Sequence, residues 1–337
     1  MRPRATIDIA TDGTVDWAVR PSSPFDPAQV SIEKLTITGG EVRLRHAAGG
    51  RDHLLSEIDA VVSARSLQGP WRLDGSLLFD GLRTRVSAAT GKADGKGGIA
   101  LKIKADPQAY PLTVEADGTA GFDKGAPNYS GQFRISARQE GKEGDTGRPG
   151  AGPDNPAAAS ASGAAPAYRL HGKFRLDHRL LAVEEFRFET GPLDDPYTAD
   201  GIASVELGPE PRFSVEASGA QMRFDEAVGA GSAAALTLPQ RVAALEKALA
   251  ALPQPAMPGT VEVRLPAVVA GDTTIREVRL SAAPAASGWQ VKSFSATLPG
   301  RTTLEAAGLL RTRDGLGFSG SLLLAVAQPS GFAAWLA

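Results

Sequence analysis

The sequence contains no cysteine, few aromatic residues and no long apolar run. Without cysteine, the chain cannot form disulfides, use a thiolate nucleophile or build a thiolate-ligated zinc site. No apolar run approaches the roughly 18 residues that a membrane-spanning helix needs. The most hydrophobic run, at residues 322–327, ends at Gln328-Pro329. The formal net charge of −2 argues against nucleic-acid binding, which generally needs a strong basic excess.

The 337 residues are 42% hydrophobic, which is typical of a folded chain, and include 38 glycines and 24 prolines. Such a composition suits many short strands joined by tight turns. No apolar stretch follows the basic residues at the start, so no secretory signal is visible. The chain starts almost within a strand and stops just after Trp335-Leu336, so we expect a fragment of a longer protein.

Apolar and polar residues alternate along much of the chain, for example at residues 99–104, 133–137, 174–176 and 261–265. Successive side chains of a strand point to opposite faces, so this alternation predicts strands with one apolar face and one polar, often basic, face. The fold is therefore expected to be mostly β. The apolar face needs a cover, and whether protein or ligand covers it is the functional question.

The first β-rich segment is expected over residues 1–138. Strands 35–37 and 42–44 flank Gly39-Gly40, which is a hairpin signal. Turns are predicted at Gly69-Pro70, Asp94-Gly95 and Asp117-Gly118. Further strands are predicted at residues 58–64, 71–79, 84–88, 99–104, 112–116 and 133–137.

Residues 139–167 consist mainly of Gly, Ala, Pro, Ser and charged residues, without a single aromatic or branched aliphatic side chain. Such a segment cannot bury enough apolar surface to offset its ordering entropy, so we expect a disordered linker. A second β-rich segment follows over residues 168–337. Its first strands are predicted at residues 169–176, 183–189, 198–207 and 213–217.

One helix is predicted near residues 239–252. Val242, Leu245, Leu249 and Leu252 recur at the spacing of an amphipathic helix. The segment 237–240 resembles a capping box, and prolines 253 and 255 end the helix. Strands are expected from residue 259 to the end of the chain.

Glycines recur inside apolar-rich strands, with a large apolar residue on either side. This pattern suggests repetition of a β unit and thus an extended sheet, although glycine-rich β-proteins also produce it by chance. The segments are 71–79, 129–133, 168–174, 303–310 and 318–322.

No motif predicts catalysis, a cofactor or a metal site. The pairs His46/His53 and His171/His178 lack the three or four converging ligands of a metal centre. The acidic cluster Asp194, Asp195 and Asp200 lacks the ligand spacing of a calcium loop and is interpreted as a turn. The sequence 31–34 matches Ser-x-x-Lys but leads directly into a strand, and 91–96 is too short for a phosphate-binding loop. We therefore expect a protein that is not an enzyme.

Apolar strand positions define one side of the predicted sheet. They could form the core of a β-sandwich or line an open groove for acyl chains. Periodicity alone does not separate these two arrangements. The positions assigned to this side, and to lipid contact in the groove arrangement, are Leu35, Ile37, Leu77, Phe79, Ile99, Leu101, Ile103, Phe133, Ile135, Phe174, Leu176, Phe186, Phe188, Val205 and Leu207.

Several turn-and-strand stretches resemble a known family. They are residues 30–42 with 67–72, residues 191–213, and residues 288–300 with their continuation at 318–320, 328–330 and 335–336. These stretches resemble the AsmA family of bacterial envelope proteins, which is related to bridge-like lipid-transfer proteins. The resemblance implies an extended antiparallel sheet curved into an open apolar groove, but brings no catalytic residues.

The resemblance also implies a function and a location. A periplasmic segment, anchored to the inner membrane in the full-length protein, would hold phospholipid acyl chains and support phospholipid transport to the outer membrane. The anchor helix of the family is missing, which agrees with a fragment. A closed β-sandwich used as a scaffold or protein-interaction module, without ligand, is the alternative.

Overall fold

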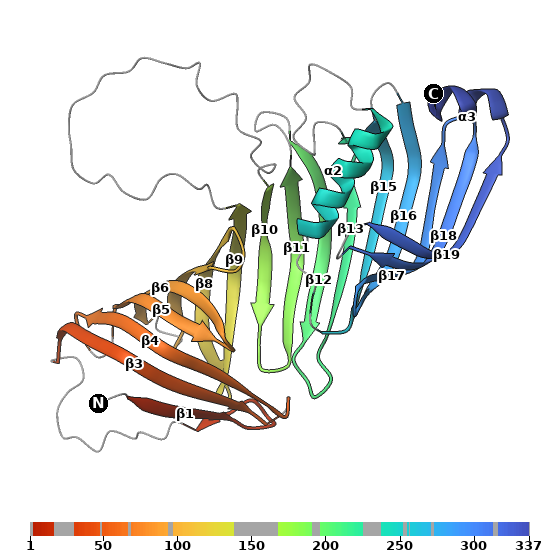
Figure 1. Ribbon diagram of the computed structural model, residues 1–337. Coiled ribbons are helices and arrows are strands. Elements are labelled where there is room, and N and C mark those ends of the chain that lie inside the picture. The colour runs from red at the N-terminus through yellow and green to blue at the C-terminus, as the bar shows by residue number, and fades with distance from the viewer. Residues whose placement is uncertain are drawn as a thin grey trace, which may run out of the picture.

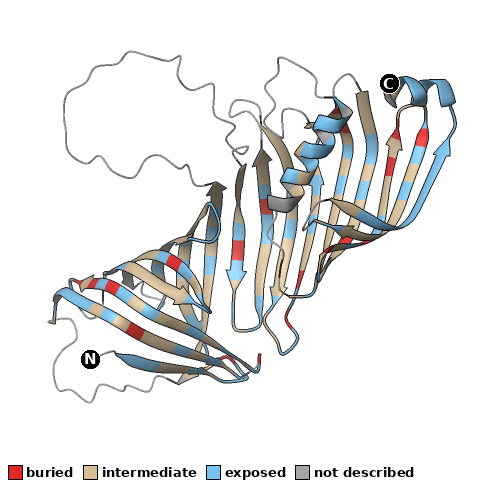
Figure 2. Ribbon diagram, viewed as in Figure 1, coloured by how far each residue is buried: buried red, intermediate tan, exposed pale blue. Residues whose placement is uncertain are grey.

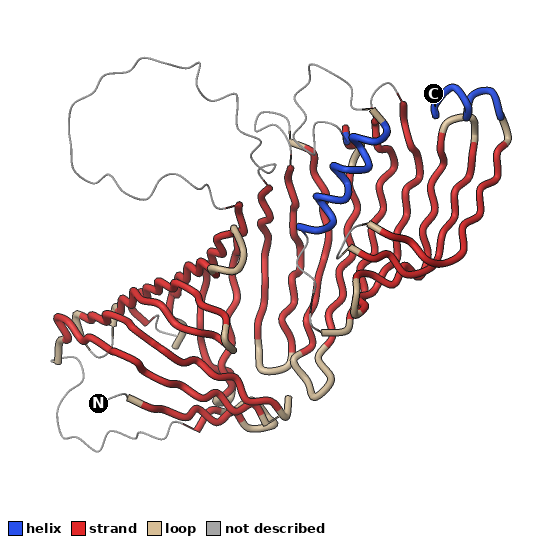
Figure 3. The backbone as a smooth tube through the Cα atoms, viewed as in Figure 1, coloured by secondary structure: helices blue, strands red, loops and turns tan. Residues whose placement is uncertain are grey.

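The structure is a computed structural model that describes residues 3–16, 30–47, 49–66, 69–93, 97–137, 168–190, 196–224, 237–251, 255, 257–270, 273–312 and 316–336. The described chain forms one large twisted sheet with two short helices, α2 and α3 (Figures 1 and 3). The mostly β fold predicted from the alternation is confirmed.

Most strands of the first half are long, apart from β1 and the two-residue β2. Their bounds are β1 Arg4–Ile9, β2 Val15–Asp16, β3 Ile32–His46, β4 Arg51–Ala64, β5 Trp71–Phe79, β6 Leu82–Ala93, β7 Ile99–Pro107, β8 Leu112–Asp123 and β9 Ala126–Ala137.

The second half begins beyond the predicted linker. Its elements are β10 Tyr168–Leu176, β11 Leu180–Thr190, β12 Tyr197–Glu206, β13 Arg212–Gly219, β14 Met222–Arg223, α2 Leu238–Ala251, β15 Gly259–Ala270, β16 Thr273–Ala285, β17 Gly288–Leu298, β18 Thr302–Arg311, β19 Gly317–Val326 and α3 Pro329–Leu336. The linker itself lies outside the described residues.

Most of the sheet is a meander. From β3 to β13 each strand pairs antiparallel with the next, and β9 pairs with β10, so the sheet continues across the linker. β13 and β14 lie parallel to β15, and the chain between them contains α2. β15 to β19 are again antiparallel.

The sheet is open rather than closed. β1 lies parallel to β3 at one end and pairs with the two-residue β2. At the other end, β19 pairs only with β18 within the described residues. All the described strands belong to this one sheet, so they do not form two separate sheets packed face to face.

Two turns predicted in the first half are wrong. Gly39 and Gly40 lie inside β3, where Gly39 has a positive φ of 59° and the register with β4 shifts on both sides of Gly40. An extra residue is thus absorbed as a bulge, and the Gly39 N–H donates a hydrogen bond to the Asp59 carboxylate at 2.8 Å. Asp117 and Gly118 lie in the middle of β8, where a Cβ on Gly118 would come within 2.1 Å of the Ser130 carbonyl oxygen. Close strand approach, not a turn, requires glycine at 118.

The amphipathic helix is confirmed as α2. The Gln240 side chain accepts a hydrogen bond from the Thr237 N–H at 2.9 Å, which is the returning half of the predicted capping box. The expectation of strands up to the end of the chain is wrong, because α3 follows β19. Pro329 occupies the first helical position, where a missing N–H costs nothing, and so favours a helix start.

Few of the described side chains are fully buried, because no second layer of described elements covers most of the sheet (Figure 2). The buried apolar residues fall in small groups on several strands. They are Ala60, Val62, Ala64, Phe174, Phe186, Phe213, Val268, Ala270, Ala282, Val291, Ala296 and Leu298.

Candidate functional site

One side of the sheet, here named the apolar face, carries Leu101, Phe133 and Phe186. Directly opposite residues of paired strands share a face, so the face can be followed from strand to strand. It contains every predicted lipid-contacting position that lies within a strand. The remaining position, Leu207, directly follows β12, and its N–H donates to the Arg179 carbonyl at 2.7 Å.

The face is continuous over many strands. Among the paired residues of β7 to β13 it bears no Asp, Glu, Lys or Arg. It continues beyond the crossover between β13 and β15, because Val215 lies opposite Val261 and Leu280 lies opposite Phe294. At the far end, Leu304 of β18 lies opposite Leu324 of β19.

The opposite side, here named the polar face, is covered with cross-strand ion pairs. Arg187 and Asp200 form two hydrogen bonds, at 2.8 and 3.2 Å, and the Arg187 guanidinium lowers the pKa of the Asp200 carboxyl. These side chains are largely exposed, so each pair adds little stability. Their charged side chains indicate that the polar face is in contact with water. Other pairs are Arg4–Glu41, Arg45–Asp8, Lys102–Asp117, Arg169–Glu189, Lys173–Glu185, Arg175–Glu184 and Arg212–Glu206.

Aromatic side chains gather in the middle of the apolar face. The Phe174 ring centroid lies 4.9 Å from that of Tyr129 and 6.4 Å from that of Phe133, both in edge-to-face geometry. The Tyr129 hydroxyl donates to the Leu101 carbonyl oxygen at 3.0 Å. Burial raises the pKa of Tyr129, so this phenol stays neutral. Tyr129 was missing from the predicted positions, although it has the same parity as Phe133.

Glycines on the apolar face make room for these large side chains. Phe186 lies over Gly201, where a Cβ would come within 2.5 Å of the Phe186 ring. Phe213 lies over Gly259 in the same way, at 2.3 Å. Gly201 and Gly259 thus have a packing role that alternation alone does not reveal.

Parts of the apolar face remain open. Leu35 is 46% exposed and Phe79 is 43% exposed, although both belong to this face. The apolar stripe of α2 does not close the gap, since Val242 is 47% and Leu245 is 40% exposed. Within the described residues, neighbouring side chains on the sheet supply most of the cover that the apolar face has.

Turns from distant parts of the sequence meet at one end of the strands. A Cβ on Gly13, in the β1–β2 turn, would come within 2.3 Å of the His178 ring in the β10–β11 turn. A Cβ on Gly49, in the β3–β4 turn, would come within 2.6 Å of His46 and 2.9 Å of the Leu207 carbonyl oxygen. The sheet therefore curves strongly between β1 and β12.

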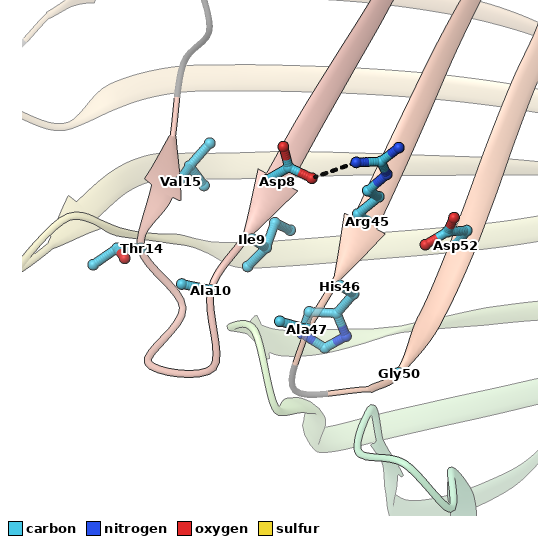
Figure 4. A pocket seen from close by; sticks show the side chains of 10 residues that line it. All are labelled: Asp8, Ile9, Ala10, Thr14, Val15, Arg45, His46, Ala47, Gly50 and Asp52. Carbon is cyan, nitrogen blue, oxygen red and sulfur yellow. Dashed lines mark ion pairs between the residues drawn. The ribbon is translucent and has the colours of Figure 1, made fainter.

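A shallow cavity of about 560 Å³ lies at this end (Figure 4). It combines the Arg45–Asp8 ion pair with the ring of His46 and the aliphatic side chains of β1 and β2. Burial lowers the pKa of His46, and a hydrogen bond to the His178 backbone opposes this effect only in part. The buried nitrogens of His178 and Nε2 of His46 have no hydrogen-bond partner in the described structure.

The histidines do not build a metal centre. Within the described ranges, no group of three or more His, Cys, Asp or Glu side chains is placed to hold a metal ion. His53, which lies within β4, hydrogen-bonds Asp80 at 2.7 Å and stacks on Phe79 at a ring-centroid distance of 5.7 Å. Asp194 and Asp195 lie outside the described residues, whereas Asp200 is the partner of Arg187.

No helix in the described part of the chain is both long and apolar enough to cross a membrane. Comparison of the chain with family models, with curated proteins and with solved structures found no match.

Proposed function

We propose that the apolar face binds the acyl chains of phospholipids and that the chain has no enzymatic activity. The observation that supports this most strongly is the continuity of the apolar face from β3 to β19 on a single open sheet. Burial of each methylene group is worth about 0.8 kcal/mol. An acyl chain laid across several strands therefore gains affinity from many weak contacts and needs no specific polar group.

The curvature favours the apolar face as the inner side of a groove. His46 belongs to this face, because it lies opposite Ile9 and continues the series Val42 and Leu44. It lies close to His178, which is in a turn many strands away. A side chain of this face reaches that turn most directly if the sheet bends toward the apolar face. The ion-paired polar face is then the convex side.

We propose further that the chain acts in the bacterial envelope, as the resemblance to the AsmA family implies. There it is a periplasmic segment of a protein anchored in the inner membrane. Such a segment shields acyl chains from water while phospholipids move between the inner and outer membranes. In the competing function, the same face binds an apolar surface of another protein and takes no lipid.

Mass spectrometry of the purified chain distinguishes the two functions. After expression in a bacterium and extensive washing, we expect phospholipids to remain bound in a reproducible molar ratio. A variant with aspartate at Phe133 and at Ile135 should fold and lose them, whereas a variant with glutamine at Arg134, on the polar face, should keep them. A folded parent chain that carries no lipid would favour the protein-binding function.

A further inference from the structure

Within the described residues, the strand β19 forms an unprotected edge of the sheet. It pairs with β18 residue by residue, from Gly317 opposite Arg311 to Val326 opposite Thr302, without any irregularity. No other strand of the described chain pairs with it. In an antiparallel pair, every second residue directs its N–H and C=O groups away from its partner. The outer side of β19 therefore presents a regular row of backbone donors and acceptors.

The sequence of β19 lacks the features that normally keep edges apart. Edge strands are commonly protected by charges, prolines or bulges, and Gly317–Val326 has none of them. Leu322, Leu323 and Leu324 are 65%, 59% and 42% exposed. Since successive residues alternate sides, both sides of this edge are apolar at its centre.

The opposite end of the sheet differs. There, β1 carries Arg4 and Asp8, which form ion pairs with Glu41 and Arg45 of β3. The two-residue β2 covers part of its outer edge. The ion pairs and the short strand β2 thus protect the β1 end of the sheet. Of the two end strands, β19 is the one whose composition resembles that of a strand with partners on both sides.

The chain that follows β19 does not block its outer edge. The Gln328 N–H donates to the Gly300 carbonyl at 2.9 Å, which directs the chain back over the β17–β18 turn. Phe332 of α3 lies against that turn, since a Cβ on Gly300 would come within 3.1 Å of the Phe332 Cβ. α3 accordingly lies at the end of the last strands (Figure 1).

We propose that β19 pairs antiparallel with β19 of a second copy of this chain, about a two-fold axis at Leu323. In this register Leu322 lies opposite Leu324 of the partner copy, and Gly320 lies opposite Val326. Residues that lie opposite each other are the same number of positions from Leu323, so they point to the same side of the sheet. Side chains of the apolar face in one copy therefore contact only apolar-face side chains of the other copy. No charge is opposed to another charge, and a small residue faces a large one away from the centre.

This pairing makes the apolar face continuous across both copies. It does not depend on lipid binding, because the contact uses the backbone edge and three leucines. A second copy is favoured over an unrelated strand because β19 is complementary to itself. On either side of Leu323, each residue of one copy lies opposite a residue of the other copy that it can pack against.

Cysteine cross-linking tests the register directly, since the natural chain has no cysteine. In the proposed register the two copies of residue 323 have Cα atoms roughly 4.5–5.5 Å apart, within the range of a disulfide. Leu323→Cys should therefore form a disulfide-linked dimer under mild oxidation. Ser319→Cys, on the same strand and side, places its two copies roughly 27 Å apart and should stay monomeric.

Sedimentation equilibrium of the full chain tests the interface itself. The parent should dimerise reversibly, and Leu323→Lys should weaken the dimer at least about tenfold, because two like charges then lie opposite each other. Val61→Lys is the matched control. Val61 is 41% exposed on the polar face of β4, a strand with partners on both sides, so this change should leave the dimer intact.

Circular dichroism confirms that each variant is folded. Selective cross-linking at 323, together with loss of the dimer in Leu323→Lys alone, supports the proposal. A parent that stays monomeric at all concentrations, equal cross-linking at 319 and 323, or a dimer indifferent to Leu323→Lys would overturn it.

Discussion

Leu101→Arg separates an open acyl-binding face from a closed core. Leu101 lies in the middle of β7, opposite Gly118 on one side and Thr90 on the other. It is only half-buried, and neighbours on the sheet rather than a second layer cover it. The arginine stem can keep part of this contact while the guanidinium reaches water along the open face.

The magnitude follows from this partial burial. Full burial of a leucine side chain is worth about 1.5–3 kcal/mol, so losing part of it should lower the free energy of unfolding by about 1–2 kcal/mol. The hydrogen bond from Tyr129 uses the Leu101 carbonyl oxygen and survives the change. In a closed core, an unpaired buried charge would instead cost several kcal/mol or prevent folding.

Two measurements check this prediction. Urea unfolding gives the stability, and the fluorescence of nitrobenzoxadiazole-labelled phosphatidylethanolamine reports binding. We expect Leu101→Arg to fold but to lose most of the bound probe. The control is Lys102→Leu, which removes the exposed 3.8 Å ion pair with Asp117 on the polar face and should change neither quantity appreciably. An unfolded Leu101→Arg chain, with a parent that binds no probe, would refute the open-face reasoning.

Three further predictions address other parts of the fold. Burial holds the pKa of His46 below its usual value of 6.5, so the unfolded chain binds more protons than the folded chain as the pH falls through 6.5. The thermal midpoint should therefore drop in this pH range, and the drop should be smaller in His46→Asn. Gly201→Val should push Phe186 off its site and lower the free energy of unfolding by about 1–3 kcal/mol in urea, whereas an unchanged midpoint would show that the ring has room to move. Deletion of residues 140–165 should leave the thermal midpoint almost unchanged, because β9 and β10 already pair and four residues suffice to join them; a large drop would show that the linker packs.

Alternation was sufficient to predict the faces of the sheet. Ile99, Leu101 and Ile103 share a side because the side-chain period of a strand is two, whatever the strand pairs with. The same rule placed Phe133 and Ile135 correctly. Bulges shift the register within β3 and β11 without destroying this assignment, since the extra residue is absorbed locally.

Long-range contacts and glycine roles could not be predicted in the same way. Gly39-Gly40 and Asp117-Gly118 carry local turn signals, but in the sheet the first pair is a bulge and the second allows close strand approach. The proximity of His46 to His178 depends on the curvature of the whole sheet, to which many strands contribute. No local pattern encodes that curvature, so the sequence could not predict that these two histidines lie close together.

The central claim is that acyl chains lie on the apolar face and not on the polar face. Site-specific incorporation of p-benzoylphenylalanine at Ile103, and separately at the adjacent Lys104, tests it in living bacteria. The two positions belong to the same strand and point to opposite faces. Irradiation should cross-link phospholipid to residue 103 and not to residue 104. Equal labelling at both positions, or labelling at neither position in a folded chain, would contradict the account.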